Sequence, residues 1–181
     1  MGIREGIVPK SDAYLSGLQT QLTEKELPSF CDNPVINSLA ADYARRCGEL
    51  EIETDFSISM PDGFSVPNYE MCIVLGNLLE NAVEACQKLN PRMAAGRNRK
   101  IELVVKMEGE HLAIMVRNTF DGNVAKAGEE LVSMKKDGGI GLQSVKAVAA
   151  QYCQSFFTEY DKEWFSAYVL WRSGTNTFNK N

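Results

Sequence analysis

Two asparagines one helical turn apart, Asn77 and Asn81, are the residues of this chain best suited to binding chemistry. They lie within residues 66–86, where apolar residues follow the helical repeat. Side chains at positions i and i+4 share one face of a helix, so the two carboxamides project together. Two neutral oxygens at that separation could share a hard cation, such as Mg²⁺, that keeps most of its water and also holds phosphate oxygens. A polar edge on a half-buried helix accounts for the pair equally well.

A glycine cluster, Asp-Gly-Gly-Ile-Gly-Leu at residues 137–142, opens a second helical pattern. Glycines there let backbone N–H groups approach an anion, and the helix N-terminus adds the positive end of its dipole. A polyphosphate suits such a site, and a flexible turn is the alternative. The chain has neither a Gly-Lys-Ser/Thr phosphate loop nor a strand followed by G-x-G-x-x-G, so a nucleotide would use neither common cradle.

Asn118 is the third candidate, because it ends an apolar strand pattern just before a long stretch with little periodicity. Facing a cavity, its side chain could hydrogen-bond the edge of a base. It could equally start an ordinary turn.

The periodicity predicts the elements that position these residues. Helices are expected at 33–47, 67–89 and 142–152, and alternating strands at 51–59, 101–107, 111–117, 155–160 and 164–171. Asn33 caps the first helix, Pro34 starts it and Gly48 ends it. Residues 11–26 have a weaker helical pattern. Residues 118–138 are expected to be a structureless connection, and connections of about 20 residues are usually functional or disordered.

Composition limits the class of protein. A chain of 181 residues, 44% hydrophobic and 24% charged, forms one substantial core. Its net charge of −5 offers no basic surface for nucleic acid, and we find neither a membrane-spanning run nor a signal peptide. Five widely spaced cysteines and a single histidine argue against zinc and favour free thiols in a reducing cytosol. We expect a cytoplasmic globular unit.

In order and spacing, these features resemble the ATP-binding catalytic domain of sensor histidine kinases, in the superfamily shared with gyrase, Hsp90 chaperones and MutL. Residues 76–86 and 139–145 look like the N-box and second glycine box of the branch that includes peptide-quorum sensor kinases of Gram-positive bacteria. The similarity covers residues 33–171. It implies an α/β (α+β) two-layer sandwich of the Bergerat type, with a mixed, mostly antiparallel sheet of about five strands and three helices on one face.

The resemblance also implies roles for individual residues. Asn77 and Asn81 look like the pair that coordinates Mg²⁺ and bridges the triphosphate. Asn118 stands where most members have an Asp that bonds the adenine amino group. Glu80 would polarise the acceptor or orient a water, or be a solvated helix residue. The implied catalytic set is Asn77, Glu80 and Asn81, and the implied nucleotide-binding set is Asn81, Lys88, Asn118, Gly122, Gly139, Ile140, Gly141 and Leu142.

The chain departs from the family pattern at three positions. Phe120 replaces the first glycine of the D-x-G-x-G box, so the adenine pocket should close differently. Asp137 stands where a glycine is common. Glu84 occupies a position that often holds a phosphate-binding Lys, which leaves that charge to Lys88, Arg92, Lys135 or Lys136.

The implied function is binding of ATP and Mg²⁺ and transfer of the γ-phosphoryl group to a histidine on a dimerisation helix absent from this chain. His111 opens a strand, and an acceptor would sit on an exposed helix. We therefore expect a fragment of a homodimeric, membrane-anchored kinase that acts on a response regulator, itself without membrane contact. Residues 1–32 would be a remnant of the dimerisation region and 33–181 the catalytic domain, with 33–49 alternatively the second dimerisation helix.

Two other classes stay open. One is a non-catalytic nucleotide- or protein-binding relative, such as an anti-sigma factor or a degenerate kinase, which Phe120 and Glu84 favour. The other is an ATPase of the gyrase or MutL kind. Those enzymes carry a water-activating Glu one turn before the metal-binding asparagine, and this chain has Asn77 there.

Overall fold

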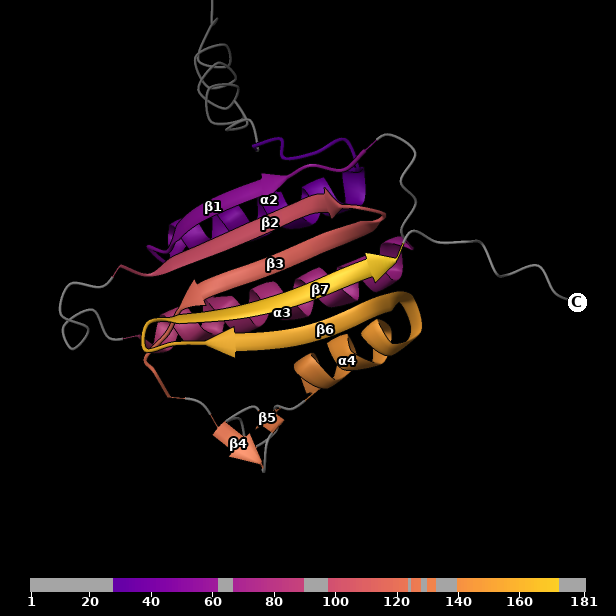
Figure 1. The fold of residues 1–181 in the computed structure, drawn as a ribbon. Helices are drawn as coiled ribbons and strands as arrows, with labels where there is room; N and C mark the ends of the chain where they lie inside the picture. Colours follow the sequence, from indigo (N-terminus) through magenta and orange to yellow (C-terminus); the bar gives the residue numbers. More distant parts are fainter. Residues whose placement is uncertain are drawn as a thin grey trace, which may run out of the picture.

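The computed structural model describes residues 28–61, 67–89, 98–123, 125–127, 130–132 and 140–172. Within them, one five-stranded sheet has the order β1-β2-β3-β7-β6, in which β1 and β2 are parallel and all other neighbours antiparallel. The described helices lie together on one face of this sheet (Figure 1). The strands are β1 (Glu53–Ile58), β2 (Lys100–Glu108), β3 (His111–Thr119), β6 (Cys153–Tyr160) and β7 (Trp164–Arg172), and the helices are α2 (Pro34–Glu49), α3 (Asn68–Lys88) and α4 (Ile140–Tyr152). The predicted two-layer α/β architecture is confirmed.

The core lies between the helices and the sheet. Alternate residues of β2 and β3 are buried, as expected for strands with one wet face. The buried set includes Leu75, Leu79 and Val83 of α3, Leu103 of β2, and Ile114 of β3. The opposite face of the sheet is open and carries an ion-pair chain that links Glu53, Lys100, Glu102 and Arg117.

The first described helix, α2, begins as its sequence indicates. The Asn33 side chain accepts hydrogen bonds from the backbone N–H groups of Val35 and Ile36, and Pro34 is the first helical residue. Its predicted end is wrong, because the helix continues through Gly48. Instead Glu51 adopts φ 55°, in the left-handed region that non-glycine residues rarely occupy. That turn delays β1 until Glu53.

The stretch after β3 also differs from its prediction. Two three-residue strands, β4 (Ala125–Ala127) and β5 (Glu130–Val132), pair as a separate antiparallel hairpin below the main sheet (Figure 1). Strands of three residues are too short to show a period-two pattern, which explains why the sequence predicted no structure. The helix that follows the glycine cluster also begins earlier than expected, since α4 starts at Ile140 and not at Leu142. The helical pattern of residues 11–26 lies outside the described residues.

Candidate functional site at the α3–α4 contact

The α3 helix presents Asn77 and Asn81, hereafter the asparagine pair, at the edge of its buried face. Both side chains are half-buried. The residues around them on α3 hold the helix against the sheet: Val74, Leu75, Leu78, Leu79, Ala82 and Val83 are all buried. The predicted helix and its apolar stripe therefore place the two carboxamides where the helix layer meets α4.

The first turn of α4 comes close to the asparagine pair. A Cβ atom built on Gly141 would stand 3.1 Å from Asn77 Oδ1, and 3.6 and 3.7 Å from Nδ2 and Oδ1 of Asn81. The first distance is tighter than nine in ten real Cβ contacts, so the absence of a side chain permits this approach. The fold thus brings together two of the motifs that the sequence singled out.

The two carboxamides have different hydrogen-bond environments. Asn77 Nδ2 donates to the carbonyl oxygen of Ile73 at 2.7 Å, which leaves its Oδ1 toward Gly141. Asn81 Nδ2 is buried and has no partner among the described residues. A buried donor without an acceptor costs about 1–3 kcal/mol. An acceptor supplied by a ligand, such as a phosphate oxygen, would remove that cost.

The asparagine pair fits a hydrated Mg²⁺–phosphate group by its chemistry. Amide oxygens are hard ligands, and Mg²⁺ commonly keeps several waters and shares phosphate oxygens with few protein ligands. In the described part of the chain, no group of three or more His, Cys, Asp or Glu side chains could hold a metal ion by itself. The N-terminus of the 13-residue α4 adds N–H groups that lack intrahelical partners beside the pair. Oxygen ligands, an unpaired donor and a helix N-terminus therefore meet in one place.

Asn118 lies in β3, between Ile101 of β2 and Phe165 of β7, and the residue is only 3% exposed. Its Nδ2 donates to the carbonyl oxygen of Thr119 at 3.0 Å. That bond uses one of the two N–H groups of Nδ2 and fixes the amide so that Oδ1 is the atom able to accept. Asn118 is therefore buried on the sheet, as a base-recognising residue would need to be.

A thiol near the end of α3 ties the helix to the strand end beside Asn118. Cys86 Sγ lies 3.4 Å from the carbonyl oxygen of Thr119 and 3.6 Å from that of Lys100. Burial raises the pKa of this thiol above its ordinary value, the contacts to Thr119 opposing that rise, so the group stays neutral. The sequence showed no sign of this link.

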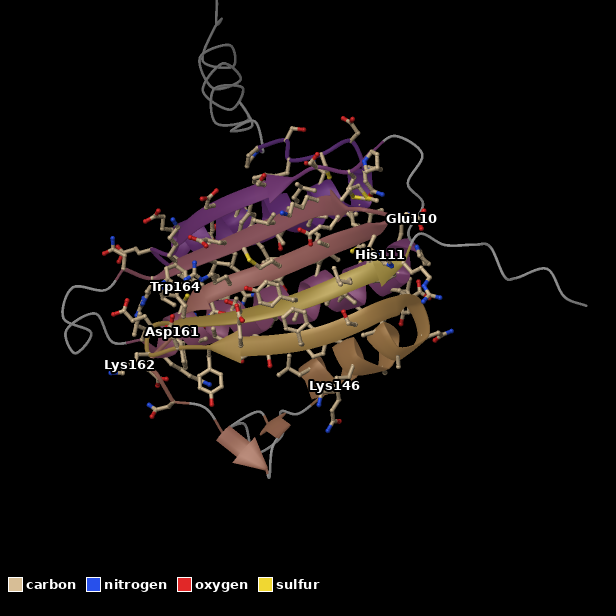
Figure 2. All side chains as sticks on the ribbon, viewed as in Figure 1. Glu110, His111, Lys146, Asp161, Lys162 and Trp164 are labelled. Carbon is tan, nitrogen blue, oxygen red and sulfur yellow. The ribbon has the colours of Figure 1, made fainter. Side chains whose placement is uncertain are left out.

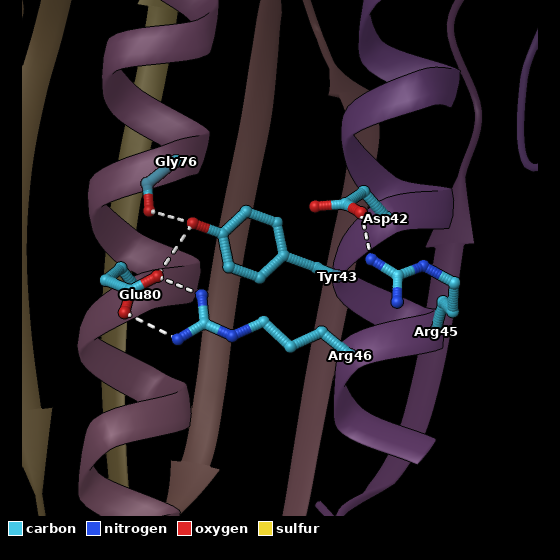
Figure 3. A network of polar contacts seen from close by, with 6 residues as sticks. All are labelled: Asp42, Tyr43, Arg45, Arg46, Gly76 and Glu80. Atoms are coloured by element: carbon cyan, nitrogen blue, oxygen red, sulfur yellow. Dashed lines mark hydrogen bonds and ion pairs between the residues drawn. The ribbon is translucent and has the colours of Figure 1, made fainter. Parts of the chain in front are cut away.

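The Glu80 carboxylate accepts hydrogen bonds from side chains of α2 (Figure 3). Arg46 donates from both terminal guanidinium nitrogens to the two carboxylate oxygens, with Nη2 2.9 Å from Oε1. The Tyr43 hydroxyl lies 3.1 Å from Glu80 Oε2 and 3.1 Å from the carbonyl oxygen of Gly76. Sequence reasoning missed Tyr43 and Arg46. Their spacing of three residues puts them on one face of α2, but nothing in the sequence identifies the partner across the helix contact.

The other predicted nucleotide-binding residues are placed as follows. Lys88 is exposed in the last turn of α3, about two turns or about 10 Å along the axis from Asn81, and is not brought to the pair. Gly122 is exposed with φ 82°, a left-handed conformation that suits glycine. Leu142 packs against the core, and Ile140 is the first residue of α4. Gly139, Lys135 and Lys136 lie outside the described residues.

The position of Phe120 and of His111 also bears on the site. Phe120 is buried, with its ring edge-on to Tyr160 and Phe165. His111 begins β3 beside the turn at Glu110, at the opposite end of the sheet from Trp164 (Figure 2). Because Asn118 lies seven residues further along the same strand, the two are about 24 Å apart. The single histidine is therefore remote from Asn118, the residue proposed to recognise the base.

The open face of the sheet carries a separate cavity of about 310 Å³, with Arg117, Trp164 and Tyr168 among its lining residues. The Arg117 guanidinium lies 4.1 Å from the centre of the Trp164 ring. The sheet separates this cavity from α3 and the asparagine pair, so it is not part of the site.

A family model described as GHKL domain matches residues 67–171, which hold α3, α4 and four strands of the sheet. The chain belongs to the GHKL domain family. No curated protein sequence matches it. The matched range of this GHKL domain contains both the asparagine pair and Gly141, so the close contact lies within the family's own region.

Solved structures share the fold of this GHKL domain. The nucleotide-free catalytic domain of histidine kinase ThkA is similar with a TM-score of 0.60 and 18% identity, over 78% of this chain and 91% of that one. Acinetobacter baumannii histidine kinase AdeS gives 0.56 and 13%, over 90% and 75%. The histidine kinase domain of the Erythrobacter litoralis EL346 blue-light activated kinase gives 0.56 and 15%, over 77% and 61%. At these identities the likeness shows the fold of histidine kinase catalytic domains. Among the described helices, none is long and apolar enough to span a membrane.

Proposed function

We propose that this GHKL domain binds ATP with Mg²⁺ and transfers the γ-phosphoryl group to a histidine carried by another polypeptide segment, as the catalytic domain of a sensor histidine kinase. The observation that carries the proposal is the meeting of the asparagine pair with Gly141. It brings together two amide oxygens, a buried Nδ2 with no partner in the described part of the chain, and the first turn of α4. The histidine-kinase fold of its structural neighbours supports the same reading.

In this proposal each residue has a defined task. Bound Mg²⁺ would neutralise phosphate charge, which is the main requirement of phosphoryl transfer. The Oδ1 atoms of Asn77 and Asn81 would hold the ion directly or through water, while Asn81 Nδ2 donates to a phosphate oxygen. Backbone N–H groups at Gly141 would bind the phosphates at the start of α4. Asn118 would accept a hydrogen bond from the adenine amino group.

The finer assignments belong to the same proposal. The N-box and glycine-box resemblance supports assigning the chain to the peptide-quorum sensor branch. The partners would then be a dimerisation helix with the acceptor histidine and a response regulator, and the domain would act in the cytoplasm of an intact, dimeric kinase. Residues 33–181 would form the catalytic domain, and the core contacts of α2 support including it.

Isothermal titration of the chain with ATP, in the presence of Mg²⁺ and again with EDTA, tests the proposal. We expect a single ATP site whose affinity falls strongly without the metal. No binding of ATP under either condition would contradict the function. Binding that is unaffected by EDTA would remove the metal from it. A chain that binds ATP–Mg²⁺ yet never labels a kinase dimerisation helix would instead be a non-catalytic nucleotide-binding relative.

A further inference from the structure

We propose that Tyr43 and Arg46 of α2 are positioning residues for the asparagine pair, acting through Gly76 and Glu80 of α3 (Figure 3). In this assignment Glu80 is an anchor: its carboxylate binds side chains of α2 and so fixes α3. It is not the group that polarises the acceptor or orients a water. The inference rests on the proposed function, because the pair matters only if it binds nucleotide.

Two side chains of α2 make the contacts with Gly76 and Glu80. Arg46 makes a two-pronged ion pair with Glu80, in which each guanidinium nitrogen meets a different carboxylate oxygen. Tyr43 adds a hydroxyl 3.1 Å from the same carboxylate and 3.1 Å from the Gly76 carbonyl oxygen. The Arg46 guanidinium also lies 5.9 Å from the centre of the Tyr43 ring. Two neighbouring side chains of one helix thus hold one turn of the next.

The turn of α3 that these contacts hold lies directly beside the asparagine pair. Gly76 and Glu80 each come immediately before one member of the asparagine pair. One residue advances a helix by about 100° and about 1.5 Å. The side of α3 that α2 holds is therefore about 100° from the side that faces Gly141. A rotation or slide of α3 would move both carboxamides relative to α4 together, and the contacts from α2 oppose such a movement.

The contacts of Glu80 explain why it suits an anchor. Both of its oxygens accept from Arg46, and one also meets the Tyr43 hydroxyl, so the carboxylate already has strong donors. The hydrogen bond to Glu80 raises the pKa of Arg46 further. Burial, then the charge and hydrogen bond of Glu80, raise the pKa of Tyr43 to about 12. Both donors therefore keep their protons throughout the physiological range.

The same helix provides a matched control. Arg45 is adjacent to Arg46, but its guanidinium pairs with Asp42 at 2.7 Å and Glu49 at 2.6 Å, both within α2 and exposed. Figure 3 shows Arg45 turned to Asp42 while Arg46 reaches α3. Arg45→Ala removes the same charge and the same side-chain type without touching α3. Any difference from Arg46→Ala reports the contact between the helices.

The experiment compares the parent chain with Arg46→Ala, Tyr43→Phe, Glu80→Gln and the control Arg45→Ala. Calorimetry gives the ATP–Mg²⁺ affinity, and NMR follows the side-chain NH₂ signals of the asparagine pair without nucleotide. We expect Arg46→Ala to weaken ATP–Mg²⁺ by about five-fold or more, the lower end of the range for coupled sites. Its asparagine NH₂ signals should shift. Tyr43→Phe should shift them less, and Arg45→Ala should change neither readout.

Two results would overturn the inference. One is parent-like affinity and unshifted asparagine signals in both Arg46→Ala and Tyr43→Phe. Another is a Glu80→Gln variant that loses phosphoryl transfer to a supplied histidine helix while its ATP affinity and asparagine signals match the parent, since that is the behaviour of a group that acts on the acceptor. If the parent itself does not bind ATP, the proposed function fails separately. The NMR comparison still decides whether α2 sets the orientation of the pair.

Discussion

Gly141 of α4 lies directly against Asn77 of α3, so close that a Cβ atom at position 141 would stand 3.1 Å from Asn77 Oδ1. The two residues are separated by β2, β3 and the β4–β5 hairpin in the sequence. Their contact turns a polar helix edge and a glycine-opened helix into one candidate site. The atom of α3 nearest to that Cβ position is Asn77 Oδ1, which is also the atom proposed to bind the metal. The space between α3 and α4 at this point is therefore the space around the proposed metal ligand.

Substitution of Gly141 by Ala should therefore damage nucleotide binding. The added methyl group would force Asn77 or the first turn of α4 to move, and overpacking of this kind typically costs about 1–3 kcal/mol. We expect the ATP–Mg²⁺ dissociation constant from calorimetry to rise by about ten-fold, which corresponds to about 1.4 kcal/mol.

Gly48→Ala is the control for that substitution. Gly48 is an exposed helical glycine of α2, and an added Cβ would meet no described atom within 4 Å. Ala should raise the free energy of unfolding by about 0.5–1 kcal/mol and leave ATP affinity unchanged. Equal ATP affinities for the parent and Gly141→Ala, with both folded by circular dichroism, would show that the close contact does not shape the site.

Asn81→Ala should separate binding from stability. Asn81 Nδ2 has no partner among the described residues, so its removal breaks no hydrogen bond there, and Ala is the better helix former. In urea unfolding without nucleotide, we expect a free energy of unfolding equal to that of the parent or higher by up to about 1 kcal/mol. Binding of ATP–Mg²⁺ should be lost. A variant that is clearly less stable would show that the amide is satisfied in the free protein, and retained binding would refute its ligand role.

The local structure was largely readable from the sequence. Strand alternation placed β2, β3, β6 and β7 to within about two residues. In β2 and β3 one face is wet and the other is buried. The end of α2 was not readable, since it depends on a left-handed Glu51 in place of the expected glycine. The Arg46–Glu80 ion pair also could not be predicted from the sequence. Each residue alone resembles an ordinary surface charge, and only tertiary packing decides which helix faces meet.

Asn118 should determine the choice of base. Its Nδ2 is held by the Thr119 carbonyl oxygen, so Oδ1 is the atom that can accept from the adenine amino group. ITP carries an oxygen at that position and should bind about ten-fold or more weakly than ATP, because a lost or opposed buried hydrogen bond costs about 1–3 kcal/mol. Asn118→Ala should weaken ATP by a similar factor and abolish the preference. Equal calorimetric affinities of the parent for ATP and ITP would exclude this role.

Alkaline pH should destabilise the fold through Cys47. Burial, with a smaller contribution from the neighbouring Cys86 thiol, raises the pKa of Cys47 to about 11. Above the ordinary thiol pKa, about 8.5, the unfolded chain loses this proton while the folded chain keeps it, so the unfolded state binds fewer protons and stability falls as pH rises. Between about pH 8.5 and pH 11 the Cys47 contribution to this slope should approach about 1.4 kcal/mol per pH unit.

Cys47→Ala provides the comparison for that slope. The variant should be less stable at pH 7, because it leaves a small cavity in the core, yet its free energy of unfolding should depend less steeply on pH above 8.5. Urea unfolding of both chains at several pH values measures the difference. Parallel curves for the two chains would mean that Cys47 ionises alike in the folded and unfolded states.

Phosphoryl transfer should require a histidine from outside this chain. His111 starts β3 at the end of the sheet away from Asn118, and its alternation with buried Leu112 places it on the open face, on the opposite side from α3. With γ-labelled ATP the chain alone should therefore gain no acid-labile phosphohistidine. A separate polypeptide that carries kinase dimerisation helices should be labelled in trans, slowly because an untethered acceptor lacks effective concentration, and Asn81→Ala should prevent it. Self-labelling that disappears in His111→Gln would refute this account of the acceptor. ATP–Mg²⁺ binding without any trans labelling would favour a non-catalytic member of the family.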